Sequence, residues 1–508
     1  MDGQQRLTTI TMILSVLRNA LQKEGLSDLS NGIHRLIERP NIDNKPQYIL
    51  STESSFPYFQ EYIQKFGKPD IKIEPGDEEK NIESTFNQIT GMIQDSTNAI
   101  RNDTTISEDS KRERIKEKLV QIRDKILGLK LIFVDLDNED DAYIIFETLN
   151  TRGKDLSVSD LVKSHLTKLL KPKNLKVDTP KLQWDRIIAT IEGSVADIDM
   201  DGFLHHYWLS KHDYVTIKKL FKEVKRTVRK TNAQDFLNEL ENDARTYRRI
   251  HETAFGKWKG EEKTIREALD AFSLFRVKQQ VPMVLSVMRD YRTGKLKKKE
   301  VERIITAIEK FHFIFTAVTS QRSSGGISQM YAASAKRLVS APAKKERTAG
   351  AKEDKIDVLN ELHNKLRGKV PSYQEFEANF KDIYFTTSYT KQRNLVKYIL
   401  CRIDAYHNSA LVIDYKSMTV EHLIPQSAVG KNGLGEKLVG QLGNLILVPP
   451  KLNNKLGNKS FGDKKALLSK CNVFLDDTIK NATVWEPSKI NERTEYLAKL
   501  AYNTIWKL

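Results

Sequence analysis

The chain has 508 residues, more than a single hydrophobic core accommodates, so roughly two to four domains are expected. Its two cysteines, Cys401 and Cys471, are too few for a disulfide framework, and no apolar run is long enough to span a membrane. A disulfide-rich secreted scaffold and a membrane protein are therefore excluded, and we expect a cytoplasmic protein. The formal charge of +16 favours a polyanionic partner, because lysine and arginine displace counterions from phosphates.

The chain opens on the polar stretch DGQQRLTT, which precedes an apolar repeat at helical spacing formed by Leu7, Ile10, Leu14, Leu17 and Leu21. Asp2 is a candidate N-cap, and Gln5 would complete a capping box that contributes about 1 kcal/mol. The N–H groups at the start of a helix also attract anions, so the same turn could hold a phosphate. The two interpretations are compatible, because a capped helix terminus is the physical basis of a phosphate site.

The segments that follow are predominantly helical. We expect charged helices near 77–100 and 107–128, a short strand at 129–137, and a helix, tight loop and helix over 139–170. Ser157 and Asp160 have the spacing of a capping box for the last of these helices. Helices dominate from 180 to 340.

Two charged segments divide this helical region. Residues 211–230 contain eight lysines and arginines against two acids, which indicates either a solvated helix face or a strip that faces DNA. Residues 341–355 are charged, rich in small side chains and without periodicity, which is typical of a linker. We therefore expect a domain boundary in or shortly after this linker.

The strongest functional pattern is VEHLIPQS followed by GNLILVPPKLNNKLGNKS, at 420–427 and 443–460. Each part has a β-prone start, and helices are expected after them at 462–470 and 485–505. Phosphodiester hydrolysis needs a base to activate water and a cation to stabilise the departing oxygen. A histidine that is neutral near pH 7 can be the base, and carboxylate and amide oxygens suit Mg²⁺. The surrounding segment holds nine lysines against three acids, so the basic surplus concentrates here.

This ordered pattern resembles the HNH, or ββα-metal, nuclease motif, with an acid–histidine pair on the first strand. The resemblance implies that Glu421 binds Mg²⁺ or Mn²⁺ and that His422 is the general base. Asn444 would hold the loop and orient the histidine, and Asn453, or its neighbour Asn454, would be the second metal ligand. Contacts to DNA phosphates would come from Lys455, Asn458 and Lys459. The alternative is that His422 is a hydrogen-bonded core histidine and that the asparagines cap turns.

The opening stretch resembles the signature of the DGQQR domain of GmrSD-type modification-dependent (type IV) restriction enzymes. FETLNTRGKDLSVSDLVKSHL, at 146–166, resembles the second signature of that domain, and an HNH domain normally follows it. The resemblance implies that the N-terminal part binds and hydrolyses a nucleoside triphosphate, whose base is not specified, and senses modified DNA. The residues implied in nucleotide binding are Asp2, Gly3, Gln4, Gln5, Arg6, Asn150 and Arg152. Arg6 would clamp phosphate and Asp160 would line the same pocket, although Arg152 with Gly153 also fits a plain loop and cap.

We therefore predict a mainly α (α+β) chain. A partial, ParB-like DGQQR domain at 1–170 would lack the family's upstream β-rich segment, a helical extension would follow at 171–345, and an HNH domain would occupy 356–508. The predicted function is metal-dependent cleavage of foreign, modified DNA in phage defence, under nucleotide regulation. The alternative is a nucleotide-regulated DNA-binding protein with an inactive nuclease motif. No membrane partner is expected, and double-strand cutting by one site per chain would favour a homodimer or repeated nicking.

Overall fold

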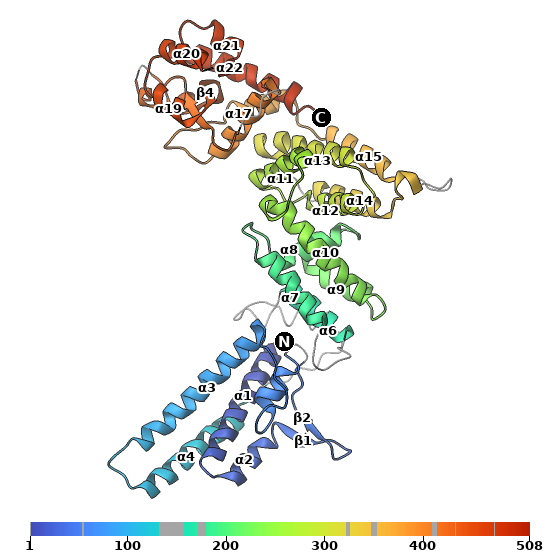
Figure 1. Cartoon of the computed structure of the whole chain (residues 1–508), viewed down its shortest axis with the longest axis vertical. Helices are drawn as coiled ribbons and strands as arrows, with labels where there is room; N and C mark the ends of the chain where they lie inside the picture. The colour runs from blue at the N-terminus through green and yellow to red at the C-terminus, as the bar shows by residue number, and fades with distance from the viewer. Residues whose placement is uncertain are drawn as a thin grey trace. The chain divides into compact units, whose positions relative to one another are not determined.

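The computed structural model describes residues 2–52, 55–131, 157–170, 179–321, 326–346, 353–408, 414–431, 433–471 and 473–508. The chain divides into two compact units, Met1–Asp185 with Phe221–Leu237 and Arg186–Leu220 with Asn238–Leu508. Helices α7 (Thr179–Glu192), α9 (Ile217–Thr227) and α10 (Ala233–His251) contain the unit boundaries. Both units are mainly helical, as predicted (Figure 1). Within the described ranges, no helix combines the length and apolar character needed to cross a membrane.

The first unit is built mainly on helices, with a short β-hairpin. Its elements are α1 (Asp2–Lys23), α2 (Ser27–His34), β1 (Glu38–Pro40), β2 (Pro46–Tyr48), the π-helix η1 (Gln60–Gln64), α3 (Asp77–Arg101), α4 (Glu108–Leu127) and α6 (Val158–Leu169). Figure 1 shows α3 and α4 as two long neighbouring helices beside α1 and α2. The strands pair antiparallel, with Glu38 opposite Tyr48.

The apolar repeat of the opening helix forms the core of this unit. Leu14, Leu17 and Leu21 of α1 are buried together with Ile93 of α3 and Leu119 of α4. Residues three and four apart share one face of a helix, so the repeat gives α1 an apolar stripe. The predicted helix at the start of the chain is confirmed.

A buried arginine interrupts that apolar stripe. The Arg18 guanidinium donates to the carbonyl oxygens of Gln64 at 2.6 Å and Lys65 at 3.1 Å, at the end of η1. It also lies 3.2 Å from Nδ1 of His34. Burial lowers the pKa of Arg18 to about 10. The arginine thereby satisfies the carbonyls that the end of the π-helix leaves unpaired.

Other expectations for the first unit have mixed outcomes. The helices expected near 77–100 and 107–128 are confirmed as α3 and α4, and Ser157 and Asp160 form the predicted capping box of α6. The β1–β2 hairpin was not predicted. Residues 132–156, which contain most of the predicted strand and the loop with Asn150 and Arg152, lie outside the described residues.

The second unit contains the helical middle of the chain and its C-terminal part. Its helices are α8 (Met200–Leu209), α11 (Lys263–Phe275), α12 (Val281–Arg292), α13 (Lys298–His312), η4 (Phe313–Val318), α14 (Gly326–Ser340), α15 (Lys355–Arg367), α16 (Tyr373–Phe380), α17 (Arg393–His407), α18 (Glu436–Gly440), α19 (Pro450–Leu456), α20 (Phe461–Lys470), α21 (Asp477–Asn481), α22 (Pro487–Leu500) and η8 (Ala501–Ile505). Its strands are β3 (Thr419–His422) and β4 (Leu445–Val448). The helices expected at 462–470 and 485–505 are therefore confirmed, whereas the basic segment 211–230 is helical only over Ile217–Thr227.

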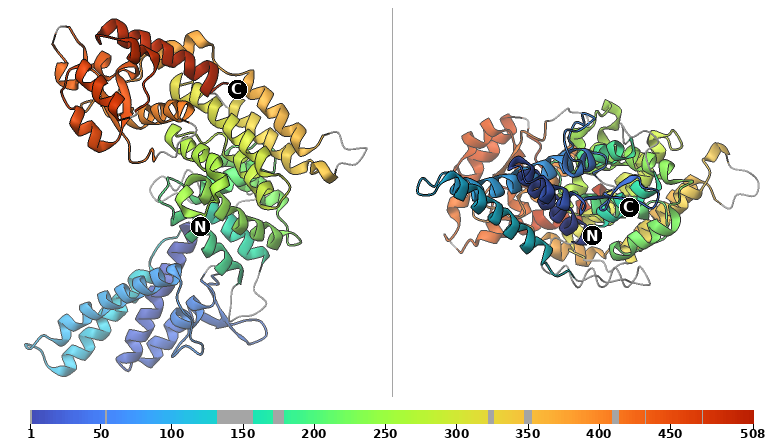
Figure 2. Two further views of the ribbon diagram at one scale, coloured as in Figure 1. Left: turned by 45° about the horizontal axis from the view of Figure 1, so that its top comes forward. Right: turned by 90° about the horizontal axis from the view of Figure 1, so that it is seen from below.

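Helix α12 is the buried central helix of the helical middle of the chain. Every residue from Val281 to Met288 is buried, and a helix that is apolar on all sides belongs inside a protein. Helices α8, α13 and α14 pack around it, and α15 packs on α13 and α14. Figure 2 shows this yellow and green part of the chain as a set of closely spaced helices. The linker predicted at 341–355 ends on Lys355, the first residue of α15. The domain limits at 345 and 356 stay a prediction.

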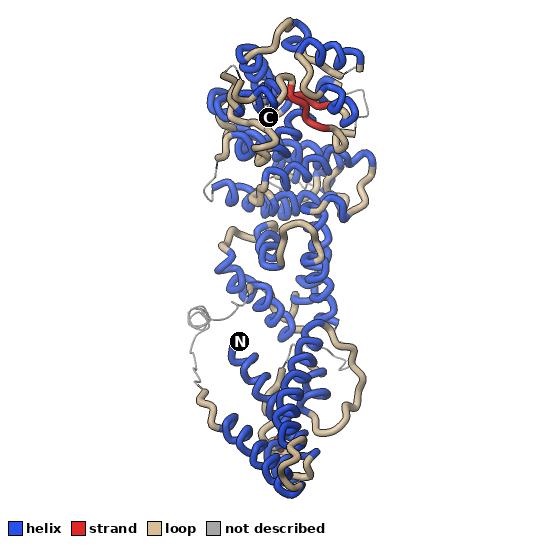
Figure 3. The backbone as a smooth tube through the Cα atoms, turned by 90° about the vertical axis from the view of Figure 1, so that its left-hand side faces the viewer, coloured by secondary structure: helices blue, strands red, loops and turns tan. Residues whose placement is uncertain are grey.

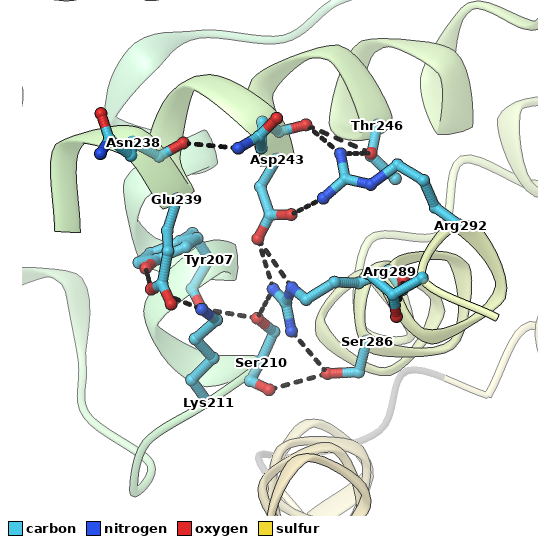
Figure 4. Close-up of polar contacts among 12 residues, drawn as sticks. Tyr207, Ser210, Lys211, Asn238, Glu239, Asp243, Thr246, Ser286, Arg289 and Arg292 are labelled. Atoms are coloured by element: carbon cyan, nitrogen blue, oxygen red, sulfur yellow. Dashed lines mark hydrogen bonds and ion pairs between the residues drawn. The ribbon is translucent and has the colours of Figure 1, made fainter. Parts of the chain in front are cut away.

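A polar network ties α8, α10 and α12 together (Figure 4). The Arg289 guanidinium donates to Oδ2 of Asp243 through two nitrogens, at 2.9 and 2.6 Å, and to Oγ of Ser210 at 2.7 Å. Arg292 approaches the other oxygen of the same carboxylate at 3.5 Å. Asp243 is almost fully buried, and a buried carboxylate is tolerated because these donors compensate its charge.

Candidate active site

The predicted catalytic segment folds as two antiparallel strands followed by a helix. In β3 and β4, Glu421 pairs with Ile446 and His422 with Leu445. Figure 3 shows this pair of strands in red, enclosed by helices of the second unit. All four residues of β4 are buried, and Pro450 begins α19, where its fixed φ suits the first turn of a helix.

The imidazole of His422 is buried, with 4% of the residue exposed, and held in one orientation. Its Nε2 lies 2.9 Å from the carbonyl oxygen of Phe385. Because a carbonyl oxygen only accepts, Nε2 carries the hydrogen and Nδ1 keeps the lone pair. Burial lowers the pKa of His422 to about 4, so the ring is neutral at pH 7. A neutral imidazole with a lone pair on Nδ1 can act as a base.

The amide of Gln426 lies next to that lone pair. Its Nε2 is 3.4 Å from Nδ1 of His422. The Oε1 atom of the same amide accepts from the backbone N–H of Thr387 at 2.7 Å and from its hydroxyl at 2.8 Å. Thr387 therefore fixes which end of the amide faces the histidine. A hydrogen bond of 3.4 Å is weak, so water can compete for Nδ1.

The carboxylate of Glu421 is bound by a lysine that the sequence did not indicate. The Lys464 ammonium, which is 0% exposed, donates to Oε1 of Glu421 and to the carbonyl oxygen of His422, both at 2.6 Å. Burial raises the pKa of Glu421, and the Lys464 ammonium limits that rise. Lys464 thus compensates the charge of a carboxylate that is only 6% exposed.

Asn444 is fully buried and organises the chain just after His422. Its Oδ1 accepts from the N–H of Ile424 at 2.8 Å, and its Nδ2 donates to the carbonyl oxygens of Ile424 at 3.0 Å and Val439 at 2.7 Å. The indole of Trp485 donates to the same Oδ1 at 3.2 Å. Every bond of this amide therefore goes to the loop or the core, and none to the imidazole.

The loop that carries Asn444 is fixed from α22. The Arg493 guanidinium donates to the carbonyl oxygens of Gly443 at 2.8 Å and Leu445 at 2.9 Å, and to Oδ2 of Asp476 at 2.7 Å. A Cβ atom at Gly443 would lie only 2.0 Å from the carbonyl oxygen of Ile490. Only glycine therefore allows α22 to approach this loop so closely.

Asn453 lies against β3. Its Nδ2 donates to the carbonyl oxygen of Val420 at 3.1 Å, which leaves its Oδ1 as the acceptor end of the amide. The neighbouring Asn454 is exposed. In the described ranges, no three His, Cys, Asp or Glu side chains form a group that could hold a metal. A metal here would therefore be held by Glu421, an asparagine oxygen and water.

The predicted DNA contacts lie at the end of α19. Lys455, Asn458 and Lys459 are all exposed. The Oδ1 atom of Asn458 accepts from the hydroxyl of Ser427 at 3.1 Å, which connects this turn to the loop after His422. The structure therefore gathers the predicted nuclease residues around β3, β4 and α19.

The structure describes little of the predicted nucleotide site. Asn150 and Arg152 lie outside the described residues, as do the side chains of Asp2, Gly3 and Gln4. Asp2, the predicted N-cap, is the first residue of helix α1, and its side chain lies outside the described residues.

Around these positions, a few side chains are described. Gln5 and Arg6 are exposed in the first turns of α1. The hydroxyl of Thr9 donates to the carbonyl oxygen of Gln5 at 2.8 Å, a bond within the helix. Asp160 accepts from the N–H of Ser157 at 3.2 Å in the capping box, so its described contact is structural.

Comparison with known families gives two matches. Residues 1–167 match the GmrSD restriction endonuclease, N-terminal domain, and residues 370–500 match the GmrSD restriction endonucleases, C-terminal domain. Together they cover more than half of the chain, in the order that the sequence resemblance implies. No curated protein matches the sequence.

These matches define the protein as a restriction endonuclease, a nuclease hydrolase with DNA as its partner and a role in phage defence. The chain belongs to the GmrSD family of these enzymes. The predicted family is therefore confirmed, and strands β3 and β4 with α19 lie inside the part matched to the C-terminal domain.

Proposed function

We propose that the C-terminal part of the chain hydrolyses DNA phosphodiesters by an HNH-type, metal-dependent reaction. The observation that carries this proposal is the fixed ring of His422, whose Nε2–H bonds to Phe385 and whose Nδ1 lone pair has only a weak partner. In the reaction, Nδ1 takes a proton from a water molecule, and that water attacks phosphorus. The bond from phosphorus to the leaving oxygen then breaks.

The residues beside His422 suit a hard divalent cation. Glu421 offers a carboxylate and Asn453 an amide oxygen, and Mg²⁺ or Mn²⁺ prefers such oxygen ligands while it keeps several waters. A bound cation would stabilise the charge on the leaving oxygen. The Lys464 ammonium already contacts Oε1 of Glu421, so a second cation there binds against a like charge, and modest affinity is expected.

The remaining residues position the chain and the DNA. Asn444 fixes the backbone after His422 and so helps to hold the imidazole in its position beside Glu421. The exposed ends of Lys455 and Lys459 can neutralise phosphates of the bound strand, with Asn458 as a hydrogen-bond donor. The proposed substrate is foreign, modified DNA.

A second part of the proposal concerns the start of the chain. The residues implied in nucleoside triphosphate binding are Asp2, Gly3, Gln4, Gln5, Arg6, Asn150 and Arg152. Support for the first five comes from their position in the first turns of a 22-residue helix, where backbone N–H groups favour an anion. We propose that nucleotide bound there regulates cleavage.

The test of the nuclease proposal is a comparison of His422→Ala with His407→Ala. His407 lies at the end of α17 in the same unit and stacks on Phe474. Supercoiled phage DNA is incubated with each purified variant in Mg²⁺ or Mn²⁺. We expect His407→Ala to cleave and His422→Ala to fail by at least a hundredfold, with unchanged circular dichroism. Retained cleavage by His422→Ala would overturn the proposal, and binding of DNA without cleavage by the wild type would favour an inactive nuclease motif.

A further inference from the structure

A basic cavity lies in the second unit, away from β3 and β4. Its volume is about 380 Å³, and it opens where α13, α15 and the last residues of the chain meet. Figures 1 and 2 show the end of the chain beside α13, and the Lys310 ammonium donates to the carbonyl oxygen of Lys507 at 3.1 Å. The charged residues that line it are Lys299, Glu302, Arg303, Lys310, His363 and Lys507.

The charge of this lining is strongly positive. Lys299, Arg303 and Lys310 come from α13 and Lys507 from the end of the chain, whereas Glu302 is the single acidic side chain among these lining residues. Within the part of the chain that the structure describes, no carboxylate forms an ion pair with any of the four cations. The side chains that line the cavity therefore carry a surplus of positive charge, which the terminal carboxylate of Leu508, also in the lining, offsets only in part.

Two cations of α13 repel each other, and Glu302 offsets only part of this repulsion. Lys299 and Arg303 are four residues apart, so they share one face of the helix, and like charges at this spacing destabilise it. The acid nearest to Lys310 in sequence is Glu309, which is buried and already accepts hydrogen bonds from Trp506 and Tyr398.

Burial and the neighbouring cations lower the pKa of two side chains that line this cavity. Burial lowers the pKa of Lys310, Glu309 offsets part of that effect, and Arg402 lowers the pKa further. The pKa of His363 is lowered by burial and by Arg303. An anion in the cavity would raise both pKa values, because it offsets the repulsion between the cations.

We infer that this cavity binds phosphate groups. Its volume lies at the lower end of ligand pockets, which span roughly 300–1,000 Å³, so it can hold one or two phosphates with their water. Arginine forks match phosphate oxygens, and lysines add charge without demanding a fixed geometry. Two sources have this chemistry: the backbone of a DNA strand and a free di- or triphosphate. None of the proposed nuclease residues lines the cavity, so this inference does not depend on the proposed reaction.

The test compares Arg303→Glu with Lys257→Glu in the full chain. Both residues are exposed in the second unit and both substitutions reverse one charge, but Lys257 does not line the cavity. Lys299→Glu is a second, independent variant of the cavity. Thermal unfolding of each variant confirms that the fold is retained.

Two probes distinguish the sources of phosphate. Fluorescence anisotropy with a labelled DNA duplex is measured over a series of salt concentrations, and inorganic pyrophosphate binding is measured by titration calorimetry. If DNA occupies the cavity, Arg303→Glu weakens duplex binding about tenfold relative to Lys257→Glu and lowers the salt slope by about one. If a free nucleotide phosphate occupies it, pyrophosphate binding falls about tenfold while duplex binding matches the control. Equal binding of both probes by the two cavity variants and the control would overturn the inference.

Discussion

Replacement of Lys464 by methionine tests the electrostatic centre of the site. The wild-type ammonium is fully buried and makes two hydrogen bonds of 2.6 Å, one of them to the Glu421 carboxylate. Removal of one partner of a buried ion pair leaves an uncompensated charge, which costs about 3–5 kcal/mol. Lys470→Met, at the exposed end of the same helix, should change stability by less than about 0.5 kcal/mol.

The assay is native-state hydrogen exchange on peptides that cover β3 and β4, because it reports the local free energy of opening. We expect Lys464→Met to lower this free energy by about 3–5 kcal/mol at pH 8. The deficit should shrink at lower pH, since a raised carboxyl pKa disfavours the folded state once the pH exceeds it. Added Mg²⁺ should restore part of the loss in the variant, because a cation replaces the missing charge beside Glu421.

Two results would refute this reasoning. One is a deficit no larger than that of Lys470→Met, which would mean that Glu421 does not depend on the ammonium. The other is a deficit that stays constant between pH 8 and pH 4.5, which would mean that the carboxylate charge is not its cause.

Two further predictions concern pH and nucleotide. Burial lowers the pKa of His206 and His312 to about 3 and that of His251 to about 4, against about 6.5 in an unfolded chain. Above pH 6.5 these histidines are neutral in both the folded and the unfolded protein, and their titration costs no stability. As the pH falls from 6.5 toward those values, only the unfolded chain takes up the protons, so the free energy of unfolding and the urea midpoint should decrease. His312→Gln should make the decrease in the free energy of unfolding shallower by about 1.4 kcal/mol per pH unit. An unchanged slope would contradict the lowered pKa of His312. Arg6→Ala should weaken nucleoside triphosphate binding about tenfold in calorimetry, while Arg35→Ala, also exposed in the first unit, should not; equal affinities would exclude Arg6 as a phosphate ligand.

The sequence predicted the parts of the site that depend on neighbours along the chain. Glu421 and His422 are adjacent on a β-prone segment, and Asn453 follows the second strand at the start of a helix. Such order is visible without a structure, because strand and helix periodicity are local. The same reasoning identified α1, α3, α4 and α20.

The contacts that tune the site come from distant residues. Lys464 is 43 residues after Glu421 and reads in the sequence as one more surface lysine of a basic helix. The acceptor of the His422 ring is the backbone of Phe385, 37 residues earlier, and a carbonyl group has no sequence signature. Arg18 in the first unit is similar, since its partners are carbonyl groups 46 and 47 residues away. Tertiary packing alone determines these partners.

Chemical rescue of His422→Gly tests most directly the central claim that His422 is the general base. His422→Gly removes the ring and leaves space beside Phe385 that a free imidazole can enter. Single-turnover cleavage of supercoiled phage DNA in Mg²⁺ is measured with and without added imidazole, beside wild type and His407→Ala. We predict that His422→Gly is inactive alone, that imidazole restores cleavage to it in a concentration-dependent manner, and that imidazole leaves the other two proteins unaffected. Cleavage at the wild-type rate by His422→Gly without imidazole would show that His422 is not the base.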